Sequence, residues 1–312
     1  MTILTLDGGG TRGFYSLRLA MHLEETMGGP LNSKFDIFCG TSVGSIIATF
    51  FAAGHSASDT NAIMLNIFNT ILPSENKGKY YGVITKNVMN FLSSGYKFKQ
   101  ETLLEALRPY FGDSTMADFP KLHICSFDTV QSTTKFFNSS TPTVKVLDAI
   151  LASSAAPVFL PPKRISTQQG TDTFLDGGLI SNNPSLFLLQ NLLSTTTKHD
   201  KNYKVLSIST HNQLAGKPLI NTLNRWNLIN NVHFLLDYFL VLQSIYPDTI
   251  LADSKILDAD ITYMRVPGSM AEIPYQYSIP MDRINKEDLG IMTADADKVF
   301  KQYRQQLHDF LR

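Results

Sequence analysis

The segment FDIFCGTSVGSIIATFF, residues 35–51, decides the fold that we expect for this chain. It begins with an apolar run typical of a buried strand and ends with small and apolar residues typical of a buried helix. Between the two stands GTSVG, residues 40–44, which fits the pattern Gly-x-Ser-x-Gly. In that pattern a sharp turn from strand to helix exposes the serine hydroxyl and crowds its neighbours, so glycines flank it. We therefore predict that Ser42 is a nucleophile.

The alternation of strand and helix continues on both sides of this segment. We expect strands at 2–6, 35–39, 122–127, 134–138, 174–175, 205–209 and 261–266. Helices are expected to end near residues 27 and 53, and to lie at 60–72, 100–111, 144–155, 184–194, 221–245 and 289–311. This order predicts a layered α/β fold with a mainly parallel sheet. Because we find no internal repeat and no low-complexity linker, we expect residues 1–312 to form one domain.

The composition excludes several classes of protein. The chain has 27 Lys and Arg against 27 Asp and Glu, so we expect no nucleic acid polymer as a partner. Only Cys39 and Cys125 are present, both in apolar runs, which favours a reducing compartment. The first residues, MTILTLDGGG, lack a basic region and reach Asp7 before an apolar run could form, so we expect no secretory signal; no apolar run reaches the length of a membrane-spanning helix. We expect a cytoplasmic protein that can still bind a membrane surface peripherally.

A second glycine motif, DGGGTRG at residues 7–13, lies between a predicted strand and a predicted helix. Consecutive glycines there expose several backbone N–H groups, which can hold a phosphate or an oxyanion. One interpretation is a dinucleotide site with Asp36 as the ribose acid, but that acid belongs at the other end of the second strand. Another is the ATP phosphate loop of an actin-like sugar kinase. The third is an oxyanion loop facing Ser42, with Arg12 adding positive charge.

A serine nucleophile needs a base, and Asp176 is the best candidate. It lies in FLDGGL, residues 174–179, where two glycines let the chain turn and project the carboxylate. An aspartate can act as the base directly if it lies within hydrogen-bonding distance of the hydroxyl. None of the seven histidines lies in a constrained loop, although His211 follows the end of a predicted strand and stays a candidate. A histidine-triad α/β-hydrolase remains the other alternative, but Ser42 comes early for that fold.

Together, residues 7–13, 40–44 and 176–178 resemble the three signature blocks of the patatin-like phospholipases. Residues 152–162 and 182–184 resemble further blocks of the same family, all in family order. The resemblance covers about residues 1–210, whereas 211–312 match only loosely. It implies a three-layer α/β/α patatin-like fold with a mainly parallel central sheet.

The resemblance also implies an activity and a site. The activity is that of a lipid acyl hydrolase of the phospholipase A or lysophospholipase type, working through an acyl-enzyme and without cofactor or metal. Its partners are the phospholipid or lysophospholipid, the membrane surface, and an activating ligand or a second copy of the chain. Bacterial relatives of this size include regulated toxins and antiphage effectors. The implied residues are Ser42 as nucleophile, Asp176 as base, and Gly8, Gly9, Gly10 and Arg12 in the oxyanion hole.

Charges are unevenly distributed along this neutral chain. Residues 74–100 carry five lysines and one glutamate among several aromatic residues, and residues 248–297 carry ten acids and four bases. The first segment is either a solvated connection or a cap that faces anionic lipid head groups. The second would then face away from the lipid, or pair with the first between subunits.

Overall fold

The computed structural model describes residues 1–72, 95–167, 170–195, 202–211, 228–253, 260–269 and 279–312; in the helix that begins at 228, side chains are described from residue 238. These residues form a mixed sheet of eight strands in the order β5-β6-β3-β2-β1-β7-β8, with β4 paired to β3. The strands are β1 (Thr2–Leu6), β2 (Ile37–Thr41), β3 (Leu122–Asp128), β4 (Thr133–Phe137), β5 (Lys163–Thr167), β6 (Gly170–Asp176), β7 (Tyr203–Ile208) and β8 (Ile261–Val266).

The centre of the sheet is parallel, from β3 through β2, β1 and β7 to β8. Strands β4 and β6 run antiparallel to β3, and β5 runs antiparallel to β6. Successive side chains of a strand point to opposite faces of the sheet, so Ile3 and Leu4 enter two different buried clusters. The prediction of a mainly parallel sheet is therefore confirmed.

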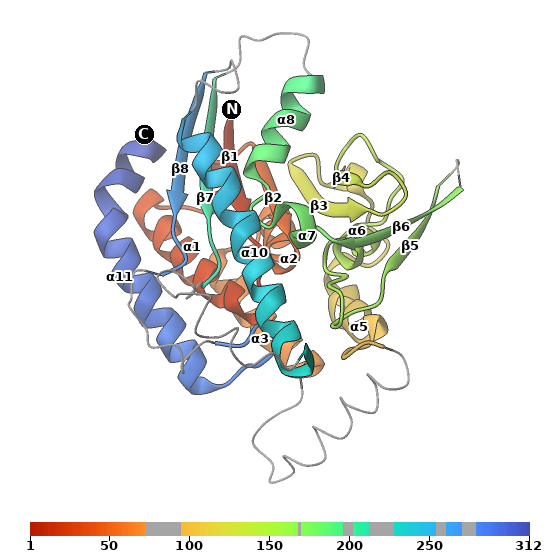
Figure 1. The fold of residues 1–312 in the computed structure, drawn as a ribbon. Helices are drawn as coiled ribbons and strands as arrows, with labels where there is room; N and C mark the ends of the chain where they lie inside the picture. The colour runs from red at the N-terminus through yellow and green to blue at the C-terminus, as the bar shows by residue number, and fades with distance from the viewer. Residues whose placement is uncertain (73–94, 168–169, 196–201, 212–227, 254–259, 270–278) are drawn as a thin grey trace.

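Helices cover both faces of the sheet, which gives three layers (Figure 1). One face carries α1 (Gly13–Met27), α2 (Val43–Ala52), α3 (Ala57–Ile71), α5 (Gln100–Phe111), α6 (Val146–Ser153) and α11 (Lys286–Leu311). The other carries α7 (Gly178–Ser181), α8 (Ser185–Thr195) and α10 (Leu228–Ala252). The three-layer α/β/α architecture expected from the sequence is confirmed.

Some elements differ from the prediction. Strand β5 was not expected, and β6 begins at Gly170 rather than at 174. Both differences occur in residues 163–173, which form a hairpin at the edge of the sheet. Because an edge hairpin carries many polar side chains, these residues lack the apolar pattern by which a buried strand is recognised. Helix α7 was missed because it has only four residues. Helix α10 extends to Ala252, beyond the predicted end at 245, and residues 221–227 lie outside the described part.

The register of the sheet brings the predicted site together. Thr41 of β2 pairs with Cys125 of β3, and the next residue of β3, Ser126, pairs with Asp176 of β6. Ser42 and Asp176 therefore lie at the same level on either side of β3. The glycine motif follows β1, which pairs with β2 on its other side and is parallel to it. All three motifs thus meet at one edge of the sheet, although up to 169 residues separate them.

Candidate active site

Ser42 lies on a strained turn between β2 and α2. Its φ of 54° and ψ of −124° fall in a region that residues with a side chain rarely occupy, as expected for an exposed nucleophile. The turn is held by Ser153, whose hydroxyl accepts the Ser42 amide at 2.8 Å and donates to the Cys125 carbonyl at 2.5 Å. At Gly44 a Cβ atom would lie 2.3 Å from the Leu6 carbonyl oxygen. The glycine after the serine is therefore required by the close approach of β1.

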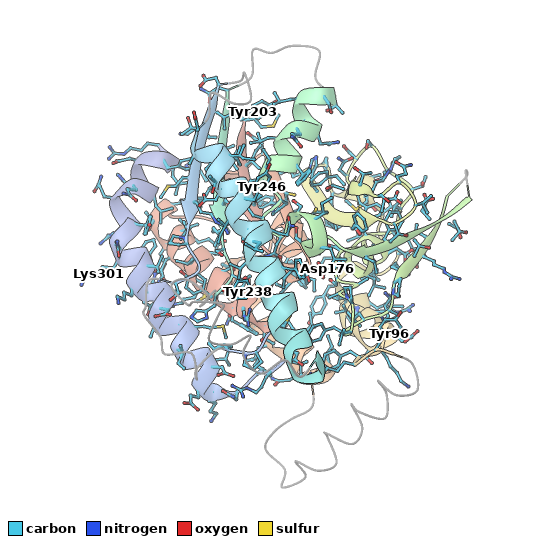
Figure 2. The ribbon with its side chains drawn as sticks, in the orientation of Figure 1. Tyr96, Asp176, Tyr203, Tyr238, Tyr246 and Lys301 are labelled. Atoms are coloured by element: carbon cyan, nitrogen blue, oxygen red, sulfur yellow. The ribbon has the colours of Figure 1, made fainter. Side chains whose placement is uncertain are left out.

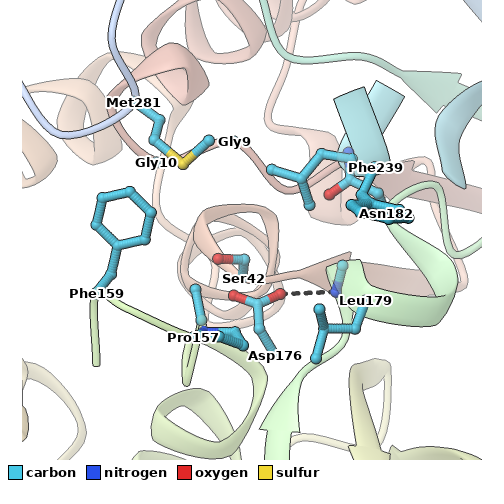
Figure 3. Close-up of a pocket in the computed structure, with 13 residues that line it drawn as sticks. Gly9, Gly10, Ser42, Pro157, Phe159, Asp176, Leu179, Asn182, Phe239 and Met281 are labelled. Atoms are coloured by element: carbon cyan, nitrogen blue, oxygen red, sulfur yellow. Dashed lines mark hydrogen bonds between the residues drawn. The ribbon is translucent and has the colours of Figure 1, made fainter. Parts of the chain in front are cut away.

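Asp176 lies beside Ser42 and is only 3% exposed. The Gly178 amide donates to its Oδ1 at 2.7 Å (Figure 3), and the Ser42 side chain also interacts with this carboxylate. Burial raises the pKa of Asp176 to about 7, because the charged form loses its hydration, while the Gly178 amide and the Ser42 side chain oppose this shift. A carboxylate with this pKa is a much stronger base than an ordinary aspartate, and it is already aimed at the hydroxyl.

The glycine loop supplies free amides on the opposite side of Ser42. Gly9 and Gly10 line the hollow that holds Ser42 and Asp176, and their amides have no acceptor among the described residues. Gly10 has a φ of 58°, and a Cβ atom there would lie 2.1 Å from the Met281 carbonyl oxygen. The loop is thus pressed against a segment from the far end of the chain. Its two free amides are placed to receive a negatively charged oxygen.

The two other residues expected in the oxyanion hole have different surroundings. The Gly8 amide donates to the Asn182 carbonyl at 3.3 Å. Arg12 is buried, and its Nε donates to the Ile279 carbonyl at 2.7 Å. Neither residue lines the hollow around Ser42. Both therefore hold the loop in place through bonds to other segments.

Two adjoining hollows meet at Ser42. Both are open to solvent, and the first has about 460 Å³ of empty volume and reaches Asp176, Phe239 and Leu240. The second has about 710 Å³, with walls from α2, α3 and α5, and both hollows are almost entirely apolar. The residues common to both are Gly10, Ser42, Ala156, Phe159 and Met281. A molecule with a polar end and a long apolar chain could occupy both hollows with its reactive bond at Ser42.

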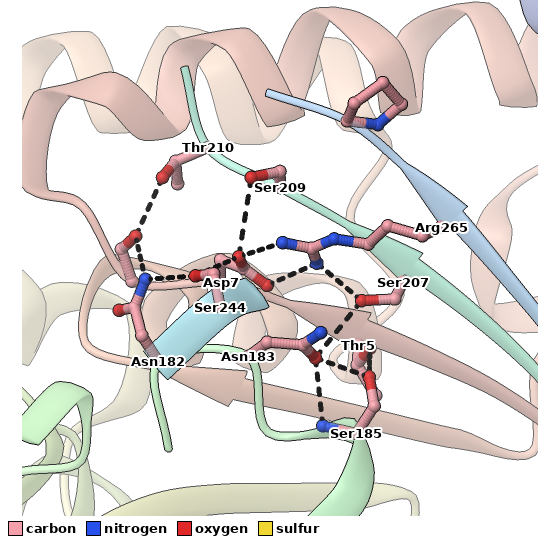
Figure 4. Close-up of polar contacts among 12 residues, drawn as sticks. Thr5, Asp7, Asn182, Asn183, Ser185, Ser207, Ser209, Thr210, Ser244 and Arg265 are labelled. Atoms are coloured by element: carbon pink, nitrogen blue, oxygen red, sulfur yellow. Dashed lines mark hydrogen bonds and ion pairs between the residues drawn. The ribbon is translucent and has the colours of Figure 1, made fainter. Parts of the chain in front are cut away.

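A buried polar network lies behind the glycine loop, around Asp7 (Figure 4). Both terminal nitrogens of Arg265, in β8, donate hydrogen bonds to the carboxylate of Asp7, and the distance from Nη1 to Oδ1 is 2.7 Å. Ser244 of α10 donates to the same carboxylate at 2.9 Å and accepts the side-chain amide of Asn182, also at 2.9 Å. That amide donates to the Gly8 carbonyl as well. The network therefore joins the loop to β8 and α10.

Burial opposes the charge of this pair and the contact between the two residues favours it; for Asp7 burial prevails and raises the pKa of the carboxyl. Burial lowers the pKa of the Arg265 guanidinium, but the neighbouring Asp7 carboxylate outweighs it and raises that pKa above its usual value. Bidentate pairing of this kind is the strongest geometry for an arginine and a carboxylate. Sequence analysis did not find Arg265 or Ser244 as site residues. The available signal was a charged residue within the predicted strand 261–266.

The remaining candidates lie away from Ser42. His211 is buried and its Nε2 lies 2.9 Å from Oδ2 of Asp295, with the ring of Tyr15 against it. No histidine lines either hollow among the residues described. Asp36 accepts the Thr2 amide at the opposite end of β2 from the glycine loop, which does not fit a ribose acid. The described residues also contain no group of three or more His, Cys, Asp or Glu that could hold a metal ion.

The two charged segments can be followed only in part. Residues 73–94, which contain three of the five lysines of the basic stretch, lie outside the described residues. Lys97 forms an ion pair with Asp282, and its Nζ lies 5.7 Å from the centre of the Phe159 ring. Basic and acidic stretches therefore meet within one chain at the edge of the second hollow, where Phe159 and Asp282 line it.

Comparison with known proteins places this geometry in a family. The family model described as patatin-like phospholipase matches residues 4–189, more than half of the chain and all three motifs. A cUMP-AMP-activated phospholipase of Escherichia coli is 26% identical over 99% of this chain and 93% of its own length. A cGAMP-activated phospholipase of Pseudomonas aeruginosa is 31% identical over 67% of this chain and 62% of its own. The chain thus spans less than two thirds of the Pseudomonas relative.

Among solved structures, VipD from Legionella pneumophila matches 99% of this chain and 66% of its own, with 14% identity and a TM-score of 0.48. The match to the family model includes both the glycine loop and the serine motif. It therefore does not favour the kinase and the histidine-triad hydrolase considered for these motifs.

Proposed function

Because the chain belongs to the patatin-like phospholipase family, we propose that it hydrolyses fatty-acyl esters of phospholipids or lysophospholipids through Ser42 and Asp176. The observation that carries this proposal is that the strained Ser42 lies on one hollow with the buried carboxylate of Asp176 and interacts with it. The free amides of Gly9 and Gly10 on the same hollow support it, because acyl transfer needs donors for a developing oxyanion.

The proposed reaction has two steps. Asp176 takes the proton of the Ser42 hydroxyl while Oγ bonds to the ester carbonyl carbon, and the Gly9 and Gly10 amides stabilise the oxyanion. The carbon–oxygen bond to the alcohol breaks, and the alcohol leaves with the proton from Asp176. Water then attacks the acyl-enzyme, Asp176 accepts the water's proton and returns it to Oγ of Ser42, and the fatty acid is released.

The second hollow is the proposed site of the acyl chain. Its walls are apolar along most of their length, including Ile46, Ile67 and Leu103. It begins at Ser42 and Gly10, where the ester carbonyl would lie. The first hollow, which is lined by Asp176 and Asn182, would take the glycerol and head group. Gly8 and Arg12 then act as supports that keep the glycine loop in register.

Regulation by a cyclic dinucleotide is the finer part of the proposal. The names of the relatives from Escherichia coli and Pseudomonas aeruginosa describe phospholipases activated by cUMP-AMP and by cGAMP. We propose that this chain is likewise switched on by a ligand of this class and acts as a bacterial membrane-degrading effector. The proposal includes association of the chain with a second copy of itself.

The test is product analysis by mass spectrometry on a mixed phospholipid extract, with and without cUMP-AMP or cGAMP. Wild type should release free fatty acids, whereas Ser42→Ala and Asp176→Asn should lose at least about 10⁴-fold in rate, because the serine and its base act as one unit. Full activity in either variant would overturn the dyad. Equal activity with and without the dinucleotides would overturn only the proposed regulation.

A further inference from the structure

Exposed apolar side chains are concentrated on one helix. In the described part of the chain, seven large apolar residues are exposed, and four of them lie on α10. They are Phe239, Leu242, Ile245 and Tyr246, with exposed fractions of 55%, 51%, 53% and 61%. Single exposed apolar residues are normal on a protein surface, but four together on two turns of one helix mark an interaction surface.

The four residues form a stripe along α10. Successive helical residues are turned by about 100°, so the four side chains occupy a sector of about 120°. Ser244 and Leu251 lie on the opposite side of the helix and are buried. Figure 2 shows Tyr238 and Tyr246 along α10, with the site residue Asp176 beside the same helix. We call Phe239, Leu242, Ile245 and Tyr246 the α10 stripe.

The α10 stripe is continuous with the active-site hollow. Phe239 is half exposed and also lines the hollow that contains Ser42, and its neighbour Leu240 lines it too (Figure 3). On its buried side, the helix is bonded to Asp7 and Asn182 through Ser244. A surface that covered the stripe would therefore lie directly over the opening to Ser42.

The charge of α10 restricts what can cover it. Residues 228–252 contain Asp237 and Asp248 and no lysine or arginine. An anionic lipid surface would repel these carboxylates, whereas a zwitterionic surface would not. Tyrosine and phenylalanine are suited to the boundary between head groups and acyl chains, because their rings are apolar and the tyrosine hydroxyl stays wet. Within the described residues, no helix is long and apolar enough to cross a bilayer, so contact here would be at the surface.

We infer that the α10 stripe docks the protein on the surface of a zwitterionic lipid bilayer and turns the hollow of Ser42 toward the lipid. This inference rests on the proposed function, since it names the surface from which the same site takes its substrate. It assigns docking to α10 rather than to the lysines of residues 74–100.

The test separates binding from catalysis. Leu242→Ser/Ile245→Ser/Tyr246→Ser removes three side chains of the stripe and leaves Phe239, which lines the hollow. Its binding to phosphatidylcholine vesicles, measured by co-sedimentation in a Ser42→Ala background, should fall at least about tenfold. When the same triple substitution is made in the protein that keeps Ser42, and cUMP-AMP or cGAMP is present, hydrolysis of the vesicles should also fall at least about tenfold. Hydrolysis of a soluble short-chain ester by this variant should stay within about twofold of the wild-type rate. The control variant Tyr110→Ser/Val130→Ser, at exposed positions outside α10, should change the hydrolysis of neither the vesicles nor the soluble ester.

Several outcomes would overturn the inference. Unchanged vesicle binding by the triple variant would do so, as would binding that requires phosphatidylglycerol and survives the triple substitution, which would point to the basic segment. Loss of a dimer in the triple variant, seen by light scattering, would assign the stripe to a second copy. If the triple variant does not fold, Tyr246→Ser alone must weaken vesicle binding measurably. A wild type that binds vesicles but hydrolyses no ester would refute the proposed function and leave the docking surface standing.

Discussion

Residues 1–210 and residues 211–312 contribute to the site in different ways. The first region carries the groups proposed to react, each beside a glycine at the end of a strand, as with Ser42 and Asp176. The second region has no such motif, yet Arg265, Ser244 and the Met281 carbonyl reach the glycine loop from three separate elements or loops. Local pattern therefore marks the groups proposed to react, and contacts distant in sequence hold them in position.

The largest effect expected from the second region is on stability. Arg265→Met leaves the Asp7 carboxylate buried without its cation, which should cost about 3–5 kcal/mol of unfolding free energy. Urea denaturation measures it. Arg18→Met is the control, because its pair with Asp297 is partly exposed and should contribute about 1 kcal/mol or less. If Arg265→Met lost no more than the control, the second region would not anchor the loop.

Gly10 is the point where the two regions touch. Gly10→Ala would place a methyl group 2.1 Å from the Met281 carbonyl oxygen and must displace the loop. Because its amides are the proposed oxyanion donors, kcat should fall by about 10²–10³-fold in an ester hydrolysis assay. Gly290→Ala, where an added Cβ meets nothing within 4 Å, should keep full activity. Near-normal turnover by Gly10→Ala would show that the loop does not need this close contact.

The first region alone sets the expected pH dependence. Only ionised Asp176 can accept the serine proton, and burial raises its pKa to about 7. Below this pH the carboxyl is protonated, so kcat/KM should rise with pH through 7 and level off above it. At pH 5 the value should be about 100-fold below the plateau. Initial rates on a soluble ester between pH 5 and 9 test this, and a flat profile would contradict Asp176 as base.

The smallest effect concerns the hydroxyl that links α10 to the loop. Ser244→Ala removes a donor to Asp7 and an acceptor for Asn182, at about 1 kcal/mol for a hydrogen bond of this kind. We expect kcat to fall about fivefold with KM unchanged, because the loop acts on the oxyanion rather than on bound substrate. Thr249→Ala, on the exposed side of α10, should have no effect. A change in KM alone would place Ser244 in substrate binding.

The sequence predicted the fold correctly where a glycine motif follows a clearly apolar strand. The parallel centre of the sheet, the three layers and the family were correctly predicted, since apolar runs and glycine turns are local signals. Strand β5 and the first half of β6 were missed, because a polar hairpin at the sheet edge lacks the apolar alternation that marks buried strands. The roles of Gly8 and Arg12 were not separable from those of Gly9 and Gly10, because adjacent residues of a tight loop point in different directions.

The sequence by itself pointed to the groups proposed to react and to the order of the layers. A strained serine turn and a glycine-flanked aspartate depend on neighbours within a few residues, and these neighbours are visible in the chain. The tertiary structure decided that Ser42 and Asp176 lie level across β3, that Asp7 meets Arg265 from 258 residues away, and that α10 leaves an apolar stripe beside the hollow. The register of the sheet and the packing of distant elements set these distances, because no short stretch of sequence contains both partners.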